Sequence, residues 1–504
     1  MRMKVIEMHQ EKTIGVIDPA TFGELATLVI SQLQKSFSEL DNRPLTCHIP
    51  PAEILNRLRE QDVPDEPRSP DQVLQEAMDL MLNYSLFSAH PRFLGYVCPA
   101  VDPMGVLADM IVAAVNPNAA SAMMAPIGHV LEHTVIRWLA KLIGFPAEAG
   151  GILLSGGNEA NLVGLLAARE HRAPWPIREV GFNHPDAAPL YVYTTKEAHN
   201  GLQKAMEIAG LGRNALRIVD TDKQLRLDVN ALREAIRKDR ATGGIPICVV
   251  ATVGTIATGV IDPLPEIVEI AADEGLWVHV DGSYGAAAAM LLDAPVELRA
   301  ISQIDSISWD PHKWLRVPFE AGCVLLRDPG ALTRTFGLRP TYYNFGEYSK
   351  IVHYYEQGPQ NSRHLRALKV WMSLNQHGRE GHASLIARDI DLTGEFFRAV
   401  QSADQLEAWT CNLCVATFQY VPDALKGHRT EPEVQCRLNK INQLILNRIQ
   451  EGGDSYLSNA VVDDNFLLRA CFVNYRTRYE DIPHVIDLVR SLGREIAEEV
   501  LTVG

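Results

Sequence analysis

The first hundred residues carry hydrophobic side chains at helical spacing, and prolines interrupt the pattern. Apolar residues recur every three or four positions from Leu25 to Leu40, and again from Val73 to Met81 after a Pro-Asp start. This periodicity is typical of amphipathic helices, and proline is well tolerated at a helix start. The pattern therefore predicts a helical N-terminal segment, to which we assign residues 1–104.

From Gly105 to about Leu374 the pattern changes to short β-branched runs that alternate with helical stretches. Helices are predicted over Asn158–His171 and Leu264–Glu274, among others. Strands that alternate with crossover helices form a mainly parallel sheet with helices on both faces. Residues 105–375 are therefore expected to form a large α/β domain. Its predicted buried strands are Gly151–Leu154, Leu190–Tyr193, Ile245–Ala251, Leu276–Val280 and Ser306–Ser308.

After Gln376 the chain mixes helices with separate strands, predicted over Cys414–Tyr420 and Phe466–Val473. Residues 376–504 are expected to form a small α+β domain. The whole chain is thus predicted to be an α/β protein, with a helical segment before the main sheet and an α+β domain after it.

Composition and charge narrow the possible functions. Of 504 residues, 47% are hydrophobic and 22% are charged, which is ordinary for a globular protein, and the net charge of −15 disfavours nucleic acid and anionic lipid as partners. The eight cysteines form no dense framework, and we interpret the single Cys411-x-x-Cys414 as two buried thiols on a strand. No signal peptide or membrane span is recognisable, so a cytoplasmic protein without a metal site is expected.

A lysine stands at the end of a predicted buried strand, in the run Ser308-Trp-Asp-Pro-His-Lys-Trp-Leu315. Lysine is rarely buried, because removing an ammonium group from water is costly. Lys313 is therefore either a surface lysine whose stem covers the strand end, or an amine that forms a Schiff base with an aldehyde. The local sequence leaves both interpretations open.

An aspartate follows another apolar strand, at Trp277-Val-His-Val-Asp281. Open α/β sheets bind ligands at the carboxyl ends of their strands, and a buried carboxylate needs a cationic partner. The protonated nitrogen of a pyridine ring would be such a partner for Asp281. The alternative is that Asp281 caps the next helix.

Two weaker signals lie upstream. Gly157 and Asn158 belong to a Ser-Gly-Gly-Asn turn between a predicted strand and helix, where free N–H groups favour an anion such as phosphate. The turn matches neither the P-loop nor the dinucleotide-binding fingerprint. His199 follows the strand predicted at Leu190–Tyr193, and alone it would be interpreted as a histidine of the core.

The order of these signals along the chain resembles that in pyridoxal-phosphate enzymes of fold type I, specifically the group II amino-acid decarboxylases. That family includes the aromatic-L-amino-acid, histidine and glutamate decarboxylases. The resemblance runs from about His90 to Val489, and Pro311-His-Lys-Trp314 is highly specific within it. It implies the fold type I architecture, pyridoxal 5′-phosphate as cofactor, and a homodimer with the active site at the interface and the N-terminal segment wrapped around the partner.

The resemblance also assigns roles to individual residues around the cofactor. Lys313 would form the Schiff base with His312 beside it, Asp281 would pair with the pyridine nitrogen, His199 would stack on the ring, Gly157 and Asn158 would bind the phosphate, and Thr255 would lie in the loop beneath. Ile256 departs from the threonine that is frequent in relatives, which would remove a hydrogen bond.

Further residues are expected around the substrate. Tyr96 would line the pocket, Ser362 would favour a polar or phenolic side chain, and Arg476 would lie near the entrance. Tyr342 resembles the proton-donating tyrosine of the family's mobile loop. Relatives that carry phenylalanine there produce an aldehyde by oxidative deamination.

One stretch departs from the family. Ala120 and Ala122 occupy positions where aromatic decarboxylases place phenylalanine and tryptophan. Either the pocket is enlarged, or the flexible Met123 and Met124 fill the space.

The resemblance implies decarboxylation of an L-amino acid, aromatic or similarly bulky, to the corresponding amine and CO₂. An aldehyde synthase or a carbon–carbon lyase acting on a related substrate is the first alternative. A catalytically silent homologue that serves as a binding subunit is the second. The tyrosine at position 342 favours the decarboxylase.

Overall fold

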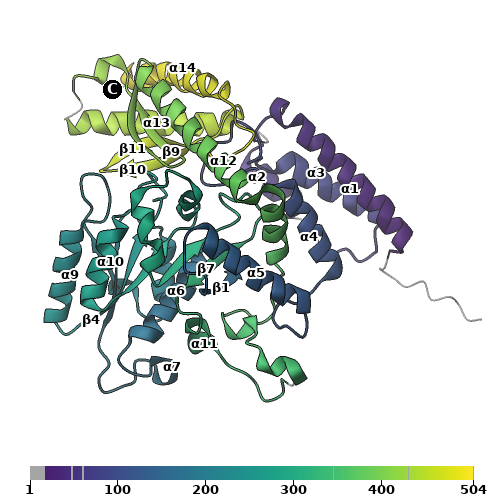
Figure 1. The fold of residues 1–504 in the computed structure, drawn as a ribbon. Coiled ribbons are helices and arrows are strands. Elements are labelled where there is room, and N and C mark those ends of the chain that lie inside the picture. Colours follow the sequence, from purple (N-terminus) through teal and green to yellow (C-terminus); the bar gives the residue numbers. More distant parts are fainter. Residues whose placement is uncertain (1–16, 47–48, 60–61, 344–345, 429–430, 503–504) are drawn as a thin grey trace, which may run out of the picture.

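The structure is a computed structural model, which describes residues 17–46, 49–59, 62–343, 346–428 and 431–502. The first three described helices are α1 (Pro19–Glu39), α2 (Pro51–Arg59) and α3 (Pro70–Tyr84), of which α1 and α3 extend away from the rest of the molecule (Figure 1). Asp18 caps α1 by accepting hydrogen bonds from the backbone N–H groups of Ala20 and Thr21. The two helices predicted here are confirmed, and α2 is an additional one.

A seven-stranded sheet with the order β1-β7-β6-β5-β4-β2-β3 forms the centre of the molecule. The pairings among β2, β3, β4, β5 and β6 are parallel, whereas β7 runs antiparallel to both of its neighbours. The mainly parallel sheet and its five predicted strands are confirmed, and β3 and β7 were not predicted. The strands are β1 (Gly150–Leu154), β2 (Leu190–Thr195), β3 (Leu216–Val219), β4 (Ile245–Thr252), β5 (Trp277–Asp281), β6 (Ser306–Trp309) and β7 (Gly322–Leu326).

Helices cover both faces of this sheet. Within β1, Ile152 and Leu154 pack into the cluster that contains α6, while Leu153 packs into the cluster that contains α5 and α10. This alternation explains why strands buried on both faces are apolar throughout. The helices of this region are α4 (Pro103–Val115), α5 (Pro126–Leu142), α6 (Gly157–Arg172), α7 (Ile177–Val180), α8 (Gly201–Ile208), α9 (Val229–Ala241), α10 (Leu264–Glu274) and α11 (Ala331–Phe336).

The C-terminal part is a four-stranded antiparallel sheet that packs against three helices (Figure 1). Its strands, in the spatial order β10-β11-β9-β8, are β8 (Leu406–Asn412), β9 (Val415–Tyr420), β10 (Ser458–Val462) and β11 (Asn465–Cys471). The two strands predicted here are confirmed as β9 and β11. The helices are α12 (Ala367–Ser402), α13 (Pro432–Gly452) and α14 (Asp481–Thr502). Residue 375, where we place the domain boundary, lies within α12, three residues before its non-helical break at Gly378.

The interpretation of the Cys-x-x-Cys motif is half wrong. Cys414 is buried and its Sγ lies 3.8 Å from that of Cys471, but Cys411 is exposed. The reason is that Cys411 belongs to β8, the edge strand of the small sheet, whereas Cys414 precedes an inner strand. In the described residues, no helix is long and apolar enough to span a membrane, and no three metal-ligating side chains are grouped.

Candidate active site

The strands β4, β5 and β6 end at one edge of the main sheet, and the residues at and after their ends line part of an open cavity of about 460 Å³. The carboxyl edge of a parallel sheet is where such proteins bind ligands. Residues from six separate parts of the chain meet there. Six predicted site residues line this cavity: Gly157, Asn158, His199, Asp281, His312 and Lys313.

Asp281 is a buried carboxylate held by four hydrogen bonds. Its Oδ2 accepts one from Asn161 Nδ2 at 2.9 Å, and its Oδ1 accepts two from Ser283, through N at 3.1 Å and Oγ at 2.7 Å. The fourth comes from Ser308 Oγ at 3.3 Å. Burial alone would raise the pKa of Asp281, but the charge of Lys313 and these hydrogen bonds hold that pKa below its usual value. Asp281 is therefore a fixed negative charge in the cavity wall.

Lys313 projects into the same cavity from the loop after β6. Its Nζ lies 3.1 Å from Oδ2 of Asp310, and 25% of its side chain is exposed. Asp310 is almost fully buried, and its Oδ1 has no hydrogen-bond partner among the described residues. Lys313 is thus an amine that faces the cavity, beside a carboxylate able to accept one more hydrogen bond.

Two histidines of the cavity are fixed in one tautomer by backbone N–H groups. Nδ1 of His199 accepts a hydrogen bond from Gly201 N, and Nδ1 of His312 accepts one from Ala321 N, both at 3.0 Å. Burial lowers the pKa of both imidazoles. Each ring is therefore neutral near pH 7 and carries its proton on Nε2.

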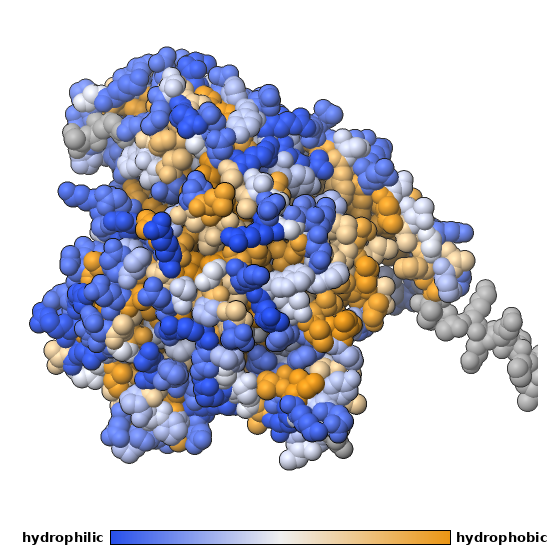
Figure 2. Space-filling model, viewed as in Figure 1, coloured by the Kyte–Doolittle hydropathy of each residue, from blue (hydrophilic) through white to orange (hydrophobic). Residues whose placement is uncertain are grey.

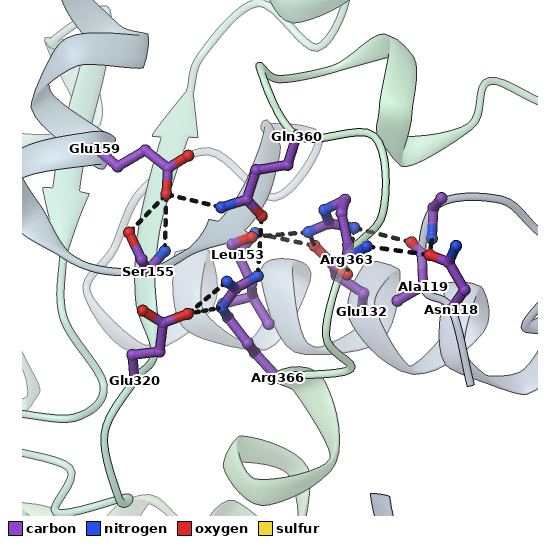
Figure 3. A network of polar contacts seen from close by, with 11 residues as sticks. Asn118, Ala119, Glu132, Leu153, Ser155, Glu159, Glu320, Gln360, Arg363 and Arg366 are labelled. Atoms are coloured by element: carbon purple, nitrogen blue, oxygen red, sulfur yellow. Dashed lines mark hydrogen bonds and ion pairs between the residues drawn. The ribbon is translucent and has the colours of Figure 1, made fainter. Parts of the chain in front are cut away.

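The turn before α6 provides the remaining wall. The helix begins at Gly157, and no described side chain caps its N-terminus, so its first N–H groups stay available to an anion. A Cβ atom at Gly157 would lie 2.5 Å from Ser283 Oγ and 2.8 Å from Asp310 Oδ2, so only glycine fits there. The Glu159 carboxylate holds the turn by accepting hydrogen bonds from N and Oγ of Ser155 and from Gln360 Nε2 (Figure 3).

The residues present fit one kind of ligand. An amine suits an aldehyde, a buried carboxylate suits a protonated ring nitrogen, and an open helix N-terminus suits a phosphate. Pyridoxal 5′-phosphate carries all three groups on one ring. The unpartnered Oδ1 of Asp310 further provides an acceptor that a bound molecule can satisfy.

The comparison with known families agrees with this geometry. The model of the "Pyridoxal-dependent decarboxylase conserved domain" matches residues 51–419. The chain belongs to the pyridoxal-dependent decarboxylase family. It is a pyridoxal-phosphate-dependent amino-acid decarboxylase, as the sequence predicted. The cofactor of the family is the ligand that the residues of the cavity fit.

Individual relatives cover almost the whole length of this decarboxylase. It is 30% identical to the aromatic-L-amino-acid decarboxylase of Bacillus atrophaeus, over 91% of this chain and 93% of that protein. It is 26% identical to the phenylacetaldehyde synthase of Petunia hybrida, over 95% and 96%. The crystal structure of mouse CSAD superimposes with a TM-score of 0.88 at 24% identity and covers 95% of this chain and 99% of that one, which establishes the same fold.

Other residues predicted for the site lie outside the decarboxylase's own cavity. Tyr342 follows α11 and is 77% exposed, and Ser362 is also exposed. Tyr96, with a positive φ of 53°, is half exposed, and its ring lies 6.0 Å from that of Tyr456. The single chain does not bring these side chains to Lys313.

Thr255 and Arg476 lie outside the cavity as well. The Thr255 hydroxyl is fully buried and bonds to Thr258 Oγ1 and Val260 N within its own loop, while the next residue, Ile256, lines the cavity. Arg476 donates a hydrogen bond to the carbonyl of Phe37 in the N-terminal segment.

The stretch that departs from the family does not fill the cavity either. Ala120 and Ala122 are buried under other residues, since Tyr355 N donates to the Ala120 carbonyl and Ala122 N donates to His353 Nδ1. Met123 and Met124 are 51% and 59% exposed. In the single chain, this stretch therefore neither enlarges the cavity nor fills it with Met123 and Met124.

The sequence analysis missed several residues that line the cavity. Asn161 lies one helical turn after Asn158, so the helical period could have placed it on the same face. Phe319 and Glu320 follow Lys313 closely, but only the return of the chain after Pro318 brings them to the cavity. Cys98 comes from the N-terminal third of the chain, and no local signal marks it.

Proposed function

We propose that this decarboxylase converts an aromatic or similarly bulky L-amino acid into its amine and CO₂. The observation that carries the proposal is the placement of the Lys313 amine and the Asp281 carboxylate on one cavity, beside the open N-terminus of α6. The bacterial relative that is 30% identical is named for aromatic L-amino acids, which supports this substrate class.

The proposed roles follow from the chemistry of each side chain. Lys313 attaches the cofactor through its Nζ, and His312 packs beside that attachment. Asp281 keeps the ring nitrogen protonated, and His199 covers the ring. When bound, pyridoxal phosphate draws electrons from the bond to the substrate carboxylate, so that CO₂ can leave. Gly157 and Asn158 hold the phosphate, and Thr255 shapes the loop that presents Ile256.

We propose further that the active site is completed by a second copy of the chain. Tyr96, Tyr342 and Ser362 have expected roles at the substrate, yet all three lie outside their own cavity. A homodimer in which the loop of one subunit reaches the cavity of the other would bring Tyr342 to the substrate. There its hydroxyl would protonate the α-carbon after CO₂ leaves. Arg476, which contacts the N-terminal segment, would act near the entrance.

An exposed apolar face supports this assembly. Hydrophobic side chains gather over α4 and the start of α5, where Figure 2 shows a broad orange area. Contiguous apolar surface of this kind marks protein interfaces. Its exposed members are Leu107, Met110, Ile111, Val115, Met123, Met124, Ile127 and Val130.

We propose a cytoplasmic location because the described cysteines are free thiols. The seven described cysteines, among them the close pair Cys414 and Cys471, are free thiols. Free thiols of this kind are typical of reducing compartments.

The test of the proposed function is a product assay. The protein loaded with pyridoxal phosphate is incubated with a panel of L-amino acids, and CO₂, amine, aldehyde and peroxide are measured. We expect equal amounts of CO₂ and amine from an aromatic substrate, no turnover by Lys313→Ala, and full turnover by the control Lys238→Ala, a residue exposed on α9. CO₂ with aldehyde and peroxide would instead favour the synthase, an activity carried by the name of the Petunia hybrida relative. No product from any amino acid would contradict catalysis.

The dimer is tested separately by sedimentation. Val115→Glu is expected to convert a dimer into monomers, because Val115 is 70% exposed within the apolar face. Leu292→Glu is the matched control, since Leu292 is fully exposed but belongs to neither α4 nor α5. A parent protein that sediments as a monomer would contradict the proposed assembly.

Mixed dimers test whether Tyr342 acts across the interface. A dimer of one Lys313→Ala subunit and one Tyr342→Phe subunit retains a single complete site only if Tyr342 serves the partner's cavity. We expect such mixtures to recover amine formation that neither parent variant shows. Without recovery, Tyr342 acts within its own subunit or has no role.

A further inference from the structure

A chain of four buried hydrogen bonds runs from the interior of the main sheet to Asp281. Trp277 Nε1 donates to Ser306 Oγ at 2.7 Å, and Ser306 Oγ lies 2.8 Å from His279 Nδ1. His279 Nε2 lies 2.9 Å from Asn161 Oδ1, and Asn161 Nδ2 donates to Asp281 Oδ2, also at 2.9 Å. All five side chains are at most 5% exposed. We name these five residues the donor chain.

The direction of every bond in the donor chain is fixed by its two ends. The indole of Trp277 can only donate a hydrogen bond, and the ionised carboxylate of Asp281 can only accept one. Asn161 must therefore turn its amide nitrogen to Asp281 and its oxygen to His279. The proton of His279 then lies on Nε2, and its Nδ1 accepts from Ser306. All four bonds consequently donate toward Asp281.

The chemical state of His279 is consistent with this direction. Burial lowers the pKa of His279 to about 4, so the imidazole is neutral near pH 7 and carries one proton. A neutral imidazole can pass on the polarity of the chain, because it donates with one nitrogen and accepts with the other.

The fold places the donor chain on three of the elements that build the cavity, β5, α6 and β6. Trp277, His279 and Asp281 alternate along β5, so their side chains share one face of the strand. Asn161 belongs to α6, whose first turn forms the anion site, and Ser306 belongs to β6, which leads to Lys313.

Gly164 allows α6 to pack closely against His279 on β5. A Cβ atom at Gly164 would lie 2.5 Å from Cε1 of His279, too close for any other residue. Because α6 lies directly on the imidazole, Asn161 can bridge His279 and Asp281.

We propose that Asn161 and His279 are positioning residues for Asp281, and that the donor chain keeps its carboxylate ionised and aimed at the cofactor nitrogen. The inference rests on the proposed role of Asp281. Four aligned dipoles that end at Oδ2 stabilise the negative charge in a region of low dielectric. An ionised Asp281 in turn favours a protonated ring nitrogen over a neutral one.

The experiment measures the preference of the protein for a nitrogen in the ring. Dissociation constants are determined by fluorescence for pyridoxal phosphate and for its 1-deaza analogue, in which a C–H group replaces the ring nitrogen. The two ligands share shape, aldehyde and phosphate, so a merely structural distortion weakens both equally. Loss of the ionised carboxylate weakens only the binding of pyridoxal phosphate. The preference, defined as the dissociation constant of the analogue divided by that of pyridoxal phosphate, then falls.

The variants are chosen along the donor chain. Asn161→Leu is expected to lower the preference about tenfold, equivalent to about 1.4 kcal/mol, and His279→Phe about threefold. Asp281→Asn should abolish the preference. Thr194→Val is the control whose ratio should not change, because it removes a buried hydroxyl of β2 that donates to the Val250 carbonyl, outside both the donor chain and the cavity lining.

The outcomes distinguish the proposed role of Asp281 from the proposed role of the donor chain. If Asp281→Asn retains the preference, the proposed role of Asp281 is wrong. If Asp281→Asn loses the preference while Asn161→Leu and His279→Phe keep it, the donor chain has no positioning role. Should Asn161→Leu fail to fold, Ser306→Ala, which deletes one hydroxyl, must still lower the ratio, and an unchanged ratio would overturn the inference.

Discussion

Replacing Arg363 with methionine should destabilise the protein without its cofactor by about 3–5 kcal/mol, the usual cost of leaving one partner of a buried ion pair unpaired. Arg363 and Glu132 are both fully buried and face each other through two contacts, of 2.6 and 3.0 Å (Figure 3). The guanidinium also donates to the carbonyls of Ala119 at 3.0 Å and Leu153 at 2.7 Å.

The magnitude follows from what the substitution leaves behind. Methionine keeps much of the volume but donates no hydrogen bond. The Glu132 carboxylate therefore loses its cationic partner, although it keeps the hydrogen bond from Leu153 N, and the two backbone carbonyls lose the hydrogen bonds from the guanidinium. Each unsatisfied buried group costs about 1–3 kcal/mol, which is consistent in sum with the range above. The effect also has a functional side, because Arg363 ties the segment after Tyr342 to the stretch that contains Ala119.

Urea unfolding of the protein without its cofactor measures this loss. The double variant Glu132→Leu with Arg363→Met should recover most of the stability, since no charge is then left buried. Arg237→Met is the control, because Arg237 pairs with Glu234 on the surface, where both are more than half exposed, and it should leave the unfolding free energy nearly unchanged. A loss below about 1 kcal/mol for Arg363→Met would refute the reasoning.

Three further predictions concern the site. Asp281→Asn should slow decarboxylation by several orders of magnitude because an amide cannot keep the ring nitrogen protonated, and a drop below about tenfold, or 1.4 kcal/mol, would contradict this role. Tyr342→Phe should release CO₂ but yield aldehyde, ammonia and peroxide under air, because the carbanion loses its acid and reacts with oxygen; clean amine at the parent rate under both air and nitrogen would assign the proton to another group. The lowered pKa of His279 means that the unfolded chain takes up a proton below about pH 6.5 while the folded one does so only near pH 4. The unfolding free energy should therefore fall by up to about 1.4 kcal/mol per pH unit as the pH drops through this window, and His279→Phe should show a shallower slope in urea titrations.

The sequence predicted those strands whose burial produces a clear pattern of hydrophobic residues along the chain. β4 and β5 are buried on both faces, so their residues read as continuous apolar runs between turn signals. β3 was missed because it is a short edge strand whose Ile218 is 59% exposed. β7 is apolar, but it runs antiparallel to both neighbours and follows the loop that contains Lys313 without a crossover helix. The alternation of strands and helices therefore does not predict it.

The same distinction applies to the site. Asp281 and Lys313 could be found because Asp281 ends a buried strand and Lys313 lies in the loop after another, and parallel strands end at a common edge. The link between Asn161 and His279 could not, since 118 residues separate them and only the packing of α6 on β5 brings them together. Motif resemblance gave Tyr342 a role, but the sequence does not say which subunit's cavity it serves.

The most direct test of the account is to locate the lysine that carries the cofactor. The protein loaded with pyridoxal phosphate is reduced with borohydride, which makes the link to the lysine permanent, then digested and analysed by mass spectrometry. We predict a single pyridoxyl-phosphate modification at Lys313, and none there in Lys313→Ala. Stoichiometric modification of another lysine, or loading without any reducible link, would contradict the assignment of this cavity as the active site.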